Sequence, residues 1–199
     1  MVSVLKRAPA TYADLEALPE DQKAELIDGV LYLMTGPKGR HIRFATVLGA
    51  LLCTRFGLSL TTTPEGPGGW WILFEPEVHL ALDRRVVRPD LAGWRRERMP
   101  VPPSDSHKFT TVPDWVCEIL SPSTASRDAF IKMPRYLEAG VQWAWIVDPV
   151  AGHISVLRAG DGAPREREWV EVGGFEGAGP HRIPPFDEVA LDLAPALVP

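Results

Sequence analysis

Residues 115–120 form a mostly apolar run, and Ser121-Pro122-Ser123 follow it. The length of this run suits a buried strand, and serine and proline are typical of the turn that closes one. A second segment, Val86 to Trp94, has the same character but contains Pro89, which indicates a sheet edge or a bulge. The pattern predicts two strands, each with one acidic residue inside it, Glu118 in the first and Asp90 in the second.

Hydrophobic spacing also predicts helices that pack on this sheet. Residues 40–56 place apolar side chains on one broad face. A second helix is expected after Glu118 and up to Gly140, with a kink or a restart near Pro134. A short helix with Thr11 as its N-cap is expected over 11–19. Strands are expected at 30–34, after a tight Asp28-Gly29 turn, and at 143–147, 153–158 and 169–172, while residues 70–82 are expected to form one or two strands.

These elements predict an α/β fold with a mixed central sheet flanked by helices. The chain has 199 residues, of which 45% are hydrophobic, so it is long enough to bury a core. One domain is expected over residues 1–199, with a core at about 23–158. Residues 160–199 are expected to add strands and an irregular arm that carries Phe186 and Leu191.

A carboxylate inside a buried strand needs a partner, because its desolvation is costly. For Glu118 the partner is either a cation in a buried salt bridge or a metal ion. Two strand-borne carboxylates, Asp90 and Glu118, would make a hard, oxygen-rich site for Mg²⁺ or Mn²⁺ if their strands are neighbours. The alternative for Asp90 is a turn acid that pairs with Arg88 or with a backbone N–H.

The charge pattern limits the kind of nucleic-acid protein this chain can be. A net charge of −5 argues against a protein that coats nucleic acid, although it leaves a nuclease open. A hairpin between the strand at 70–82 and the Asp90 strand would place arginines at the same end of the sheet as Asp90. These arginines form either a solvated face or a phosphate contact surface. They are Arg84, Arg85, Arg88, Arg95, Arg96 and Arg98.

Other polar residues have two interpretations each. Glu25 is expected to be a solvated surface acid, with a supporting role at a metal site as the alternative. His41, in the first turn of the helix at 40–56, is a capping group or a phosphate-binding group. Glu75, Glu77 and His79 alternate along one strand face, and a half-exposed strand is the preferred interpretation over a site. Residues 99–113 have the composition of a surface loop, either a cover for substrate or a spacer.

The two cysteines, Cys53 and Cys117, show no metal-ligand spacing and are expected to be reduced core residues. No apolar run approaches the length of a membrane span, and the first residues lack the order of a signal peptide. A cytoplasmic location is therefore expected.

A set of short motifs, in order along the chain, resembles the Uma2 (DUF820) family. The resemblance runs from about residue 11 to about residue 157. It implies a restriction-endonuclease-like PD-(D/E)XK core and Mg²⁺ or Mn²⁺ as cofactor. The motifs are Glu25-Leu26-Ile27-Asp28-Gly29, His41, Arg88-Pro89-Asp90, Glu118-Ile119-Leu120-Ser121-Pro122-Ser123, Asp128 with Lys132 and Tyr136, Gly140-Val141, and Trp145-Ile146-Val147-Asp148-Pro149.

The resemblance also implies roles for single residues. Asp90, Glu118 and the backbone carbonyl of Ile119 would hold the metal. The usual lysine of this fold lies two residues after the glutamate, where this chain has Leu120, so Lys132 from the next helix would replace it. The alternative is an exposed ion pair between Lys132 and Asp128 on one helical face. The expected supporting residues are Glu25, His41, Asp128 and Tyr136, and the expected nucleic-acid contacts are Arg88, Arg95 and Arg96.

The sequence thus predicts a metal-dependent endonuclease that hydrolyses phosphodiester bonds, with DNA as the expected substrate, and leaves a homodimer open. The alternative is a degenerate nuclease fold that binds DNA or a protein partner without cutting. The acidic net charge, the displaced lysine and the tryptophans Trp70, Trp71 and Trp94, expected to be exposed, favour that alternative. The chain has no Gly-X-Ser-X-Gly motif, P-loop or dinucleotide fingerprint, so no other enzyme chemistry is supported.

Overall fold

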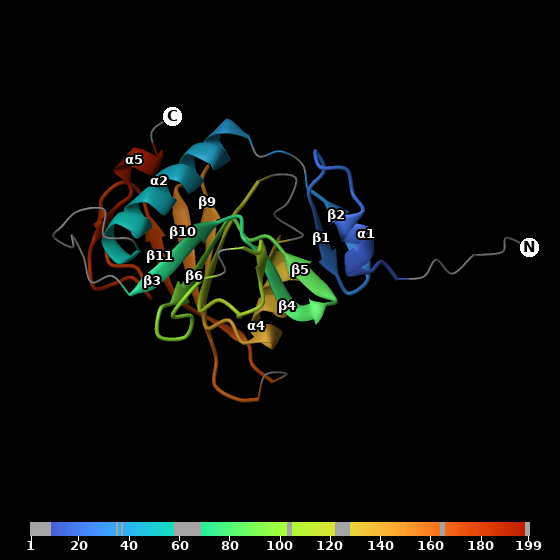
Figure 1. Ribbon diagram of the computed structural model, residues 1–199. Helices are drawn as coiled ribbons and strands as arrows, with labels where there is room; N and C mark the ends of the chain where they lie inside the picture. The colour runs from blue at the N-terminus through green and yellow to red at the C-terminus, as the bar shows by residue number, and fades with distance from the viewer. Residues whose placement is uncertain are drawn as a thin grey trace, which may run out of the picture.

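The computed structural model of the chain contains two main sheets and a few helices (Figure 1). It describes residues 9–34, 36, 38–57, 69–102, 105–121, 128–163 and 166–197, without the side chains of 82, 83, 128 and 129. The helical elements are α1 (Tyr12–Glu16), α2 (Gly39–Phe56), the π-helical turn η1 (Asp128–Lys132), α4 (Met133–Ala139) and α5 (Ala194–Leu197).

The larger sheet is mixed and six-stranded, and it contains the strand of Glu118 at an inner position. The β8–β9 pair is parallel and the other pairs are antiparallel. In spatial order its strands are β11 (Trp169–Glu176), β10 (His153–Ala159), β9 (Trp143–Asp148), β8 (Trp115–Ile119), β6 (Leu91–Arg95) and β3 (Trp70–Phe74).

The second sheet is five-stranded and contains the hairpin predicted around Asp28-Gly29. Its order is β2 (Val30–Leu33), β1 (Ala24–Ile27), β5 (Arg85–Val87), β4 (Glu77–Asp83) and β7 (Lys108–Phe109). Asp28 and Gly29 both have positive φ, 50° and 81°, as a two-residue hairpin turn requires. A short two-stranded sheet joins β12 (Pro180–His181) to β13 (Leu191–Asp192).

The two faces of the six-stranded sheet pack against different partners. Helix α2 and the chain after β12 cover one face, and their side chains share a core with Trp115, Cys117 and Ile119 of β8. Helix α4 and the five-stranded sheet cover the other face. In Figure 1, α2 accordingly crosses one side of the sheet, while α4 lies below β4 and β5. Since neighbouring residues of a strand point to opposite faces, Glu118 points to the α4 side.

Several predicted elements are confirmed. Thr11 caps α1 in a capping box with Asp14, and α2 spans almost the predicted residues. The helix after Glu118 changes from η1 to α4 at Met133, next to Pro134, as the missing proline N–H led us to expect. The strands β9, β10 and β11 lie where the alternation of residues predicted strands.

The single strand predicted over Val86–Trp94 is wrong. The segment forms β5 in the five-stranded sheet and β6 in the six-stranded sheet, and Arg88-Pro89-Asp90 connects them. Proline cannot donate to a sheet ladder, so the chain leaves one sheet at this point and enters the other. The hairpin partner of β4 is consequently β5, whereas the strand after Asp90 pairs with β3 and β8.

The segment between β12 and β13 is irregular, as expected, but it packs on the sheet and is not an arm. Phe186 is fully buried and contacts the rings of Trp115 and Trp145. The Trp145 indole N–H donates to the Pro184 carbonyl at 2.6 Å, which holds the segment on the sheet. Leu191 is likewise buried. Aromatic and aliphatic burial therefore makes this part of the chain a layer of the first core.

Candidate functional site

Glu118 lies at the centre of a buried polar cluster on the α4 side of the sheet. Its side chain is 3% exposed. The Tyr136 hydroxyl of α4 donates to Glu118 Oε1 at 2.6 Å, and Lys132 Nζ lies 2.7 Å from the same oxygen. The buried carboxylate is thus stabilised by a cation and a hydroxyl donor that both come from the segment after β8.

Lys132 reaches the position that the sequence suggested for it. Its side chain is 2% exposed, and Nζ lies 2.9 Å from Glu25 Oε1 and 3.3 Å from the Arg88 carbonyl oxygen. The alternative of an exposed lysine is therefore wrong, because η1 turns this side chain inward. The side chain of Asp128, the predicted partner of that pair and a predicted supporting residue, lies outside the described part of the chain.

Glu25 belongs to the same cluster, so its expected place on the surface is wrong. It lies on β1, which has β2 on one side and β5 on the other, and its side chain is fully buried. Besides Lys132, Glu25 Oε1 accepts a hydrogen bond from the Arg88 backbone N–H at 2.8 Å. The sequence around Glu25 gave no indication that Lys132 and the Arg88 peptide would pack against it.

Asp90 ends the connection between the two sheets and faces the end of β8. Its Oδ2 accepts a hydrogen bond from the Ile119 backbone N–H at 2.6 Å, and its Oδ1 lies 2.9 Å from His41 Nε2 of α2. The structure thus brings Asp90, His41 and the residue after Glu118 together. The Ile119 carbonyl as a metal ligand stays a prediction.

The pKa of the Cys117 thiol is affected by both carboxylates. Burial raises its pKa well above the usual range, and the negative charges of Asp90 and Glu118 raise it further. Both acids lie near Cys117, since Glu118 is the next residue of β8 and Asp90 accepts from the Ile119 N–H. Asp90 itself lies in the connection before β6, so the prediction that it lies inside a strand is wrong. The expectation of a reduced, buried Cys117 is confirmed, and Cys53 is also a free thiol.

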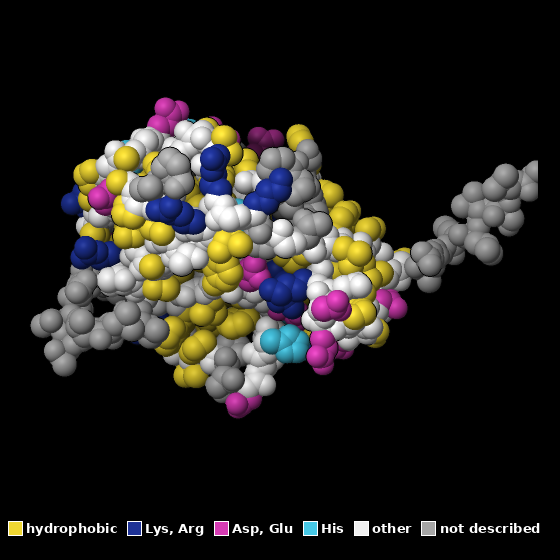
Figure 2. All heavy atoms as spheres, turned by 90° about the horizontal axis from the view of Figure 1, so that it is seen from above, with side chains coloured by type: hydrophobic (Ala, Val, Ile, Leu, Met, Phe, Trp, Pro, Cys, Tyr) yellow, Lys and Arg dark blue, Asp and Glu magenta, His cyan; other side chains and the backbone are white. Residues whose placement is uncertain are grey.

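The arginines do not gather around Asp90 as predicted. Arg95 lies at the far end of β6 from Asp90, roughly 16 Å along a strand of this length. Arg95 and Arg96 stack on the rings of Trp70 and Trp71. Because the predicted strand divides between two sheets, its arginines separate. Figure 2 shows lysines and arginines dispersed among apolar and acidic side chains on the face seen from above.

The tryptophans expected to be exposed are mostly core residues. Trp94 is fully buried and Trp70 is 3% exposed. These two residues therefore no longer favour the alternative of a fold that binds a partner without cutting. The Trp94 indole N–H donates to the Thr111 carbonyl at 2.8 Å. This contact also holds part of the segment at 99–113, which pairs with β4 through β7. The loop expected there is therefore partly a strand of the second sheet.

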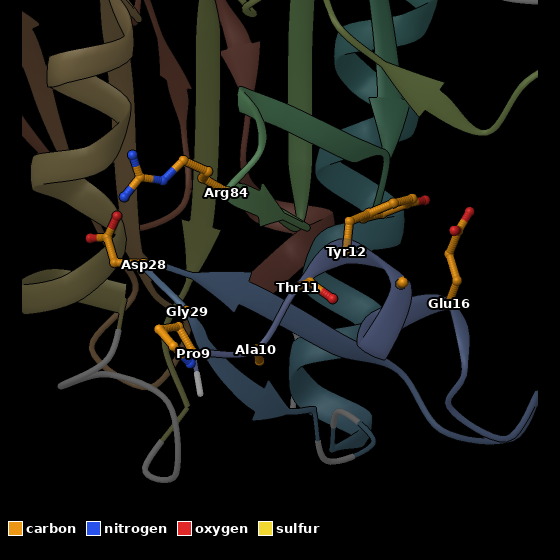
Figure 3. Close-up of a pocket in the computed structure, with 9 residues that line it drawn as sticks. Pro9, Ala10, Thr11, Tyr12, Glu16, Asp28, Gly29 and Arg84 are labelled. Carbon is orange, nitrogen blue, oxygen red and sulfur yellow. The ribbon is translucent and has the colours of Figure 1, made fainter. Parts of the chain in front are cut away.

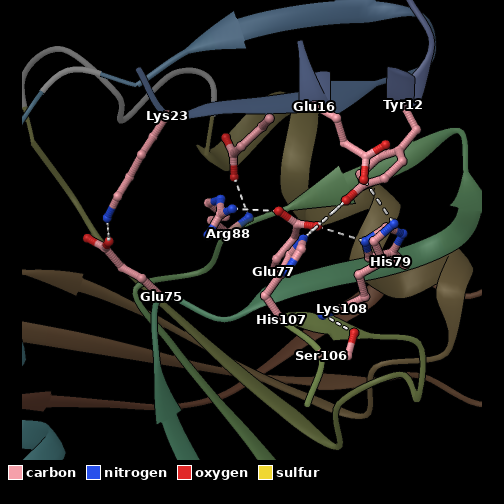
Figure 4. Close-up of polar contacts among 11 residues, drawn as sticks. Tyr12, Glu16, Lys23, Glu75, Glu77, His79, Arg88, Ser106, His107 and Lys108 are labelled. Carbon is pink, nitrogen blue, oxygen red and sulfur yellow. Dashed lines mark hydrogen bonds and ion pairs between the residues drawn. The ribbon is translucent and has the colours of Figure 1, made fainter. Parts of the chain in front are cut away.

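A second buried polar cluster surrounds Glu77, and the expectation of a half-exposed strand missed it. Glu77 accepts hydrogen bonds from the Tyr12 hydroxyl at 2.8 Å and from Arg88, and His79 Nε2 lies 3.0 Å away (Figure 4). His107 Nε2 lies 3.5 Å from the same carboxylate. The Glu-Xaa-His alternation was the available signal, but only the five-stranded sheet and α1 show that its residues are buried.

Titration of this cluster follows from its contacts. Burial acts to raise the pKa of Glu77, but hydrogen bonds from His79 and Tyr12 and the charge of Arg88 outweigh it and lower the pKa below 4.5. Burial and the neighbouring carboxylate raise the pKa of Tyr12 well above its usual value. At neutral pH, Glu77 is therefore ionised and Tyr12 is a neutral donor.

A hollow of about 730 Å³ opens elsewhere, beside α1 (Figure 3). Thr11, Tyr12 and Glu16 line one side, and Asp28, Gly29 and Arg84 line the other. None of the predicted catalytic or supporting residues lines it. The hollow is therefore separate from the Asp90 and Glu118 cluster.

Within the described ranges, no three histidine, cysteine, aspartate or glutamate side chains converge as a ready-made metal site. In the same part of the chain, no helix is both long enough and apolar enough to cross a membrane.

The fold and the buried cluster together define the class of protein. A mixed sheet with helices on both faces, a glutamate on an inner strand and an aspartate at the start of the neighbouring strand, is a restriction-endonuclease-like α/β fold. The chain belongs to the Uma2 family, whose description is "Putative restriction endonuclease" and whose family model matches residues 9–194. The family and fold expected from the motifs are thereby confirmed.

A solved relative supports the same fold. The crystal structure of a "putative nuclease" of DUF820 from Anabaena variabilis has a TM-score of 0.68 to this chain at 22% sequence identity. The match covers 95% of this chain and 98% of the other. The comparison with curated proteins gave no match.

Proposed function

We propose that the chain is a metal-dependent endonuclease that hydrolyses phosphodiester bonds of DNA at Asp90, Glu118 and Lys132. The observation that carries the proposal is the contact of 2.7 Å between Lys132 Nζ and Glu118 Oε1. A nuclease site of this kind requires a lysine beside its acidic metal ligands, and Lys132 lies beside Glu118, one of the two acids that we propose for that role. The displaced lysine therefore supports the proposal instead of weakening it.

The donor set fits a hard divalent ion. Asp90 and Glu118 offer carboxylate oxygens, which are the donors that Mg²⁺ and Mn²⁺ prefer. Mg²⁺ keeps several waters and commonly uses only one or two carboxylates, so the two carboxylates of Asp90 and Glu118 suffice. Asp90, Glu118 and the Ile119 carbonyl would hold the ion, which would lower the pKa of a bound water and shield phosphate charge.

The residues of the chain itself prepare the site. Tyr136 and Lys132 fix the Glu118 carboxylate, and His41 and the Ile119 N–H fix Asp90. Lys132 carries positive charge and N–H donors at Nζ, next to the place where negative charge would develop on the phosphate. Fixed donors of this kind need no rearrangement during the reaction, so orientation is already established in the folded protein.

A DNA cleavage assay tests the proposal. In Mg²⁺ or Mn²⁺ the wild type should nick or cut plasmid DNA, and Asp90→Asn, Glu118→Gln and Lys132→Met should each lose at least about 100-fold in rate. Lys23→Met, at an exposed lysine that pairs with Glu75 outside the site, is the matched control and should retain near-wild-type cleavage. Equal activity of Glu118→Gln and the wild type would refute the proposal.

The alternative, a fold that binds without cutting, has one observation in its favour. Each acid of the site has a partner within the protein, so the fold does not depend on a metal. Thermal unfolding separates the two, because a ligand raises the melting temperature only of a folded state that binds it. Mn²⁺ should raise the melting temperature of the wild type and not that of Glu118→Gln. The absence of any shift in the wild type would favour the alternative.

A further inference from the structure

Arg88 joins the two buried clusters, and its backbone and side chain face different ones. Its N–H donates to Glu25 at 2.8 Å, and its carbonyl oxygen lies 3.3 Å from Lys132 Nζ. Its guanidinium donates to Glu77 (Figure 4). The Arg88 peptide therefore forms part of the wall around the Lys132 amine, while its side chain extends into the Glu77 cluster.

The position of that peptide is not set by a sheet ladder. Arg88 lies in the connection between β5 and β6, and the next residue is Pro89, which has no N–H to donate. A segment of this kind depends on side-chain contacts to fix its path. The contact between the Arg88 guanidinium and Glu77 supplies such an anchor.

Glu77 is suited to hold this anchor. Its side chain is 5% exposed, and its donors come from separate segments, Tyr12 of α1, His79 of β4 and Arg88 of the connection. His107 lies at the exposed edge of the cluster. The carboxylate is ionised at neutral pH and held on several sides, so the guanidinium has a fixed partner and is turned toward it instead of toward solvent.

We propose that Glu77 is a positioning residue, which fixes Arg88 and, through the Arg88 peptide, the amine of Lys132. Arg88 then links Glu77 to the wall around the Lys132 amine, whereas the sequence suggested that it contacts phosphate. The effect on rate rests on the proposed function of Lys132, whereas the position of the Lys132 amine can be measured without any activity.

The first test reads the Lys132 side chain directly. In protein with ¹³C- and ¹⁵N-labelled lysine, the Lys132 resonance is assigned by its loss in Lys132→Met. Glu77→Gln should shift that resonance. The control is Glu75→Gln, because Glu75 lies two residues away and pairs with Lys23 at 2.7 Å, turned away from Arg88 (Figure 4). It should leave the Lys132 resonance in place.

The second test uses kinetics on plasmid DNA in Mg²⁺. Glu77→Gln should lower kcat by roughly 10- to 100-fold with little change in KM, because small displacements of a catalytic group cost rate more than binding. Adding Arg88→Met to Glu77→Gln should cause little further loss, since both act on one contact. Glu77→Asp, which keeps the charge but withdraws it, should fall between Glu77→Gln and the wild type in both tests.

A folded Glu77→Gln protein with an unchanged Lys132 resonance would overturn the inference. If Glu77→Gln does not fold, an unchanged resonance in Glu77→Asp would overturn it equally. If the wild type cleaves no DNA, the nuclease proposal fails, and a shifted Lys132 resonance would still support the positioning role.

Discussion

Glu77 and Glu118 are both buried acids, but the protein compensates their charges in different ways. Glu77 is one carboxylate among several donors, Tyr12, His79 and Arg88. Glu118, in contrast, shares a single lysine with Glu25, and Asp90 lies close by. Among the contacts of the described residues, Glu77 accepts from donors on three separate segments, whereas Lys132 lies between two buried acids.

The difference indicates what each cluster is for. A carboxylate surrounded by donors is fully compensated, so it holds segments together and has no need of a further cation. The second cluster brings carboxylates together around one lysine, and this is the arrangement that the proposed metal site requires. Burial and perturbed surroundings alone would have marked both as candidate sites, and the balance of donors and acids separates them.

The largest effect should come from the loss of Lys132, the cation that Glu118 and Glu25 share. Lys132→Met should lower the free energy of unfolding by about 3–5 kcal/mol, because two buried acids lose a cation that both of them contact. Denaturant unfolding measures it. Adding Glu118→Gln to Lys132→Met should recover part of the loss, since one of the uncompensated charges is then gone. Full additivity of the two substitutions would show that they do not share one contact.

The donor-rich cluster should be less sensitive to the loss of charge. Glu77→Gln should cost about 1–3 kcal/mol, the range for a buried group that loses hydrogen bonds. The pKa of Glu77 is lower in the folded protein, so its contribution is fully present above about pH 4.5 and is lost as pH falls through the lower folded pKa. The difference in stability between wild type and Glu77→Gln should therefore shrink below pH 4.5. A constant difference from pH 7 to pH 2 would contradict this account.

The smallest effect should come from an ion pair outside both clusters. Lys23 is 59% exposed and pairs with Glu75 at 2.7 Å. Lys23→Ala should change the free energy of unfolding by about 1 kcal/mol or less, because solvent and salt screen an exposed pair. Unfolding in low and high salt measures the difference. A loss as large as that of Glu77→Gln would mean that exposure does not separate these contacts.

Local features were predictable because they depend on residues close in sequence. The Asp28-Gly29 turn, the Thr11 cap and the long helix α2 follow from backbone preferences and apolar spacing. The break near Pro134 follows from a missing N–H. The ordered motifs indicated the family and drew attention to Asp90 and Glu118. They did not indicate which residues contact either acid.

Burial of the polar residues was not predictable in the same way. Glu25 and Glu77 lie on short strands whose alternation fits a half-exposed sheet, and only contacts with the other sheet and with α1 and α4 close over them. The division of Val86–Trp94 between two sheets was not predictable for the same reason. Pro89 indicates that a strand is interrupted, but not which sheet the chain enters next.

The sequence by itself determined most of the elements, their order and the place of Glu118 inside a strand, because backbone sterics and hydrophobic periodicity act over a few residues. Only the tertiary structure decided which cation meets which acid. Lys132 reaches Glu118 and Glu25 because η1 turns it inward between two sheets, and Arg88 reaches Glu77 because its chain crosses from one sheet to the other. Pairings between distant residues depend on how the layers pack, and the layers meet only in the folded protein.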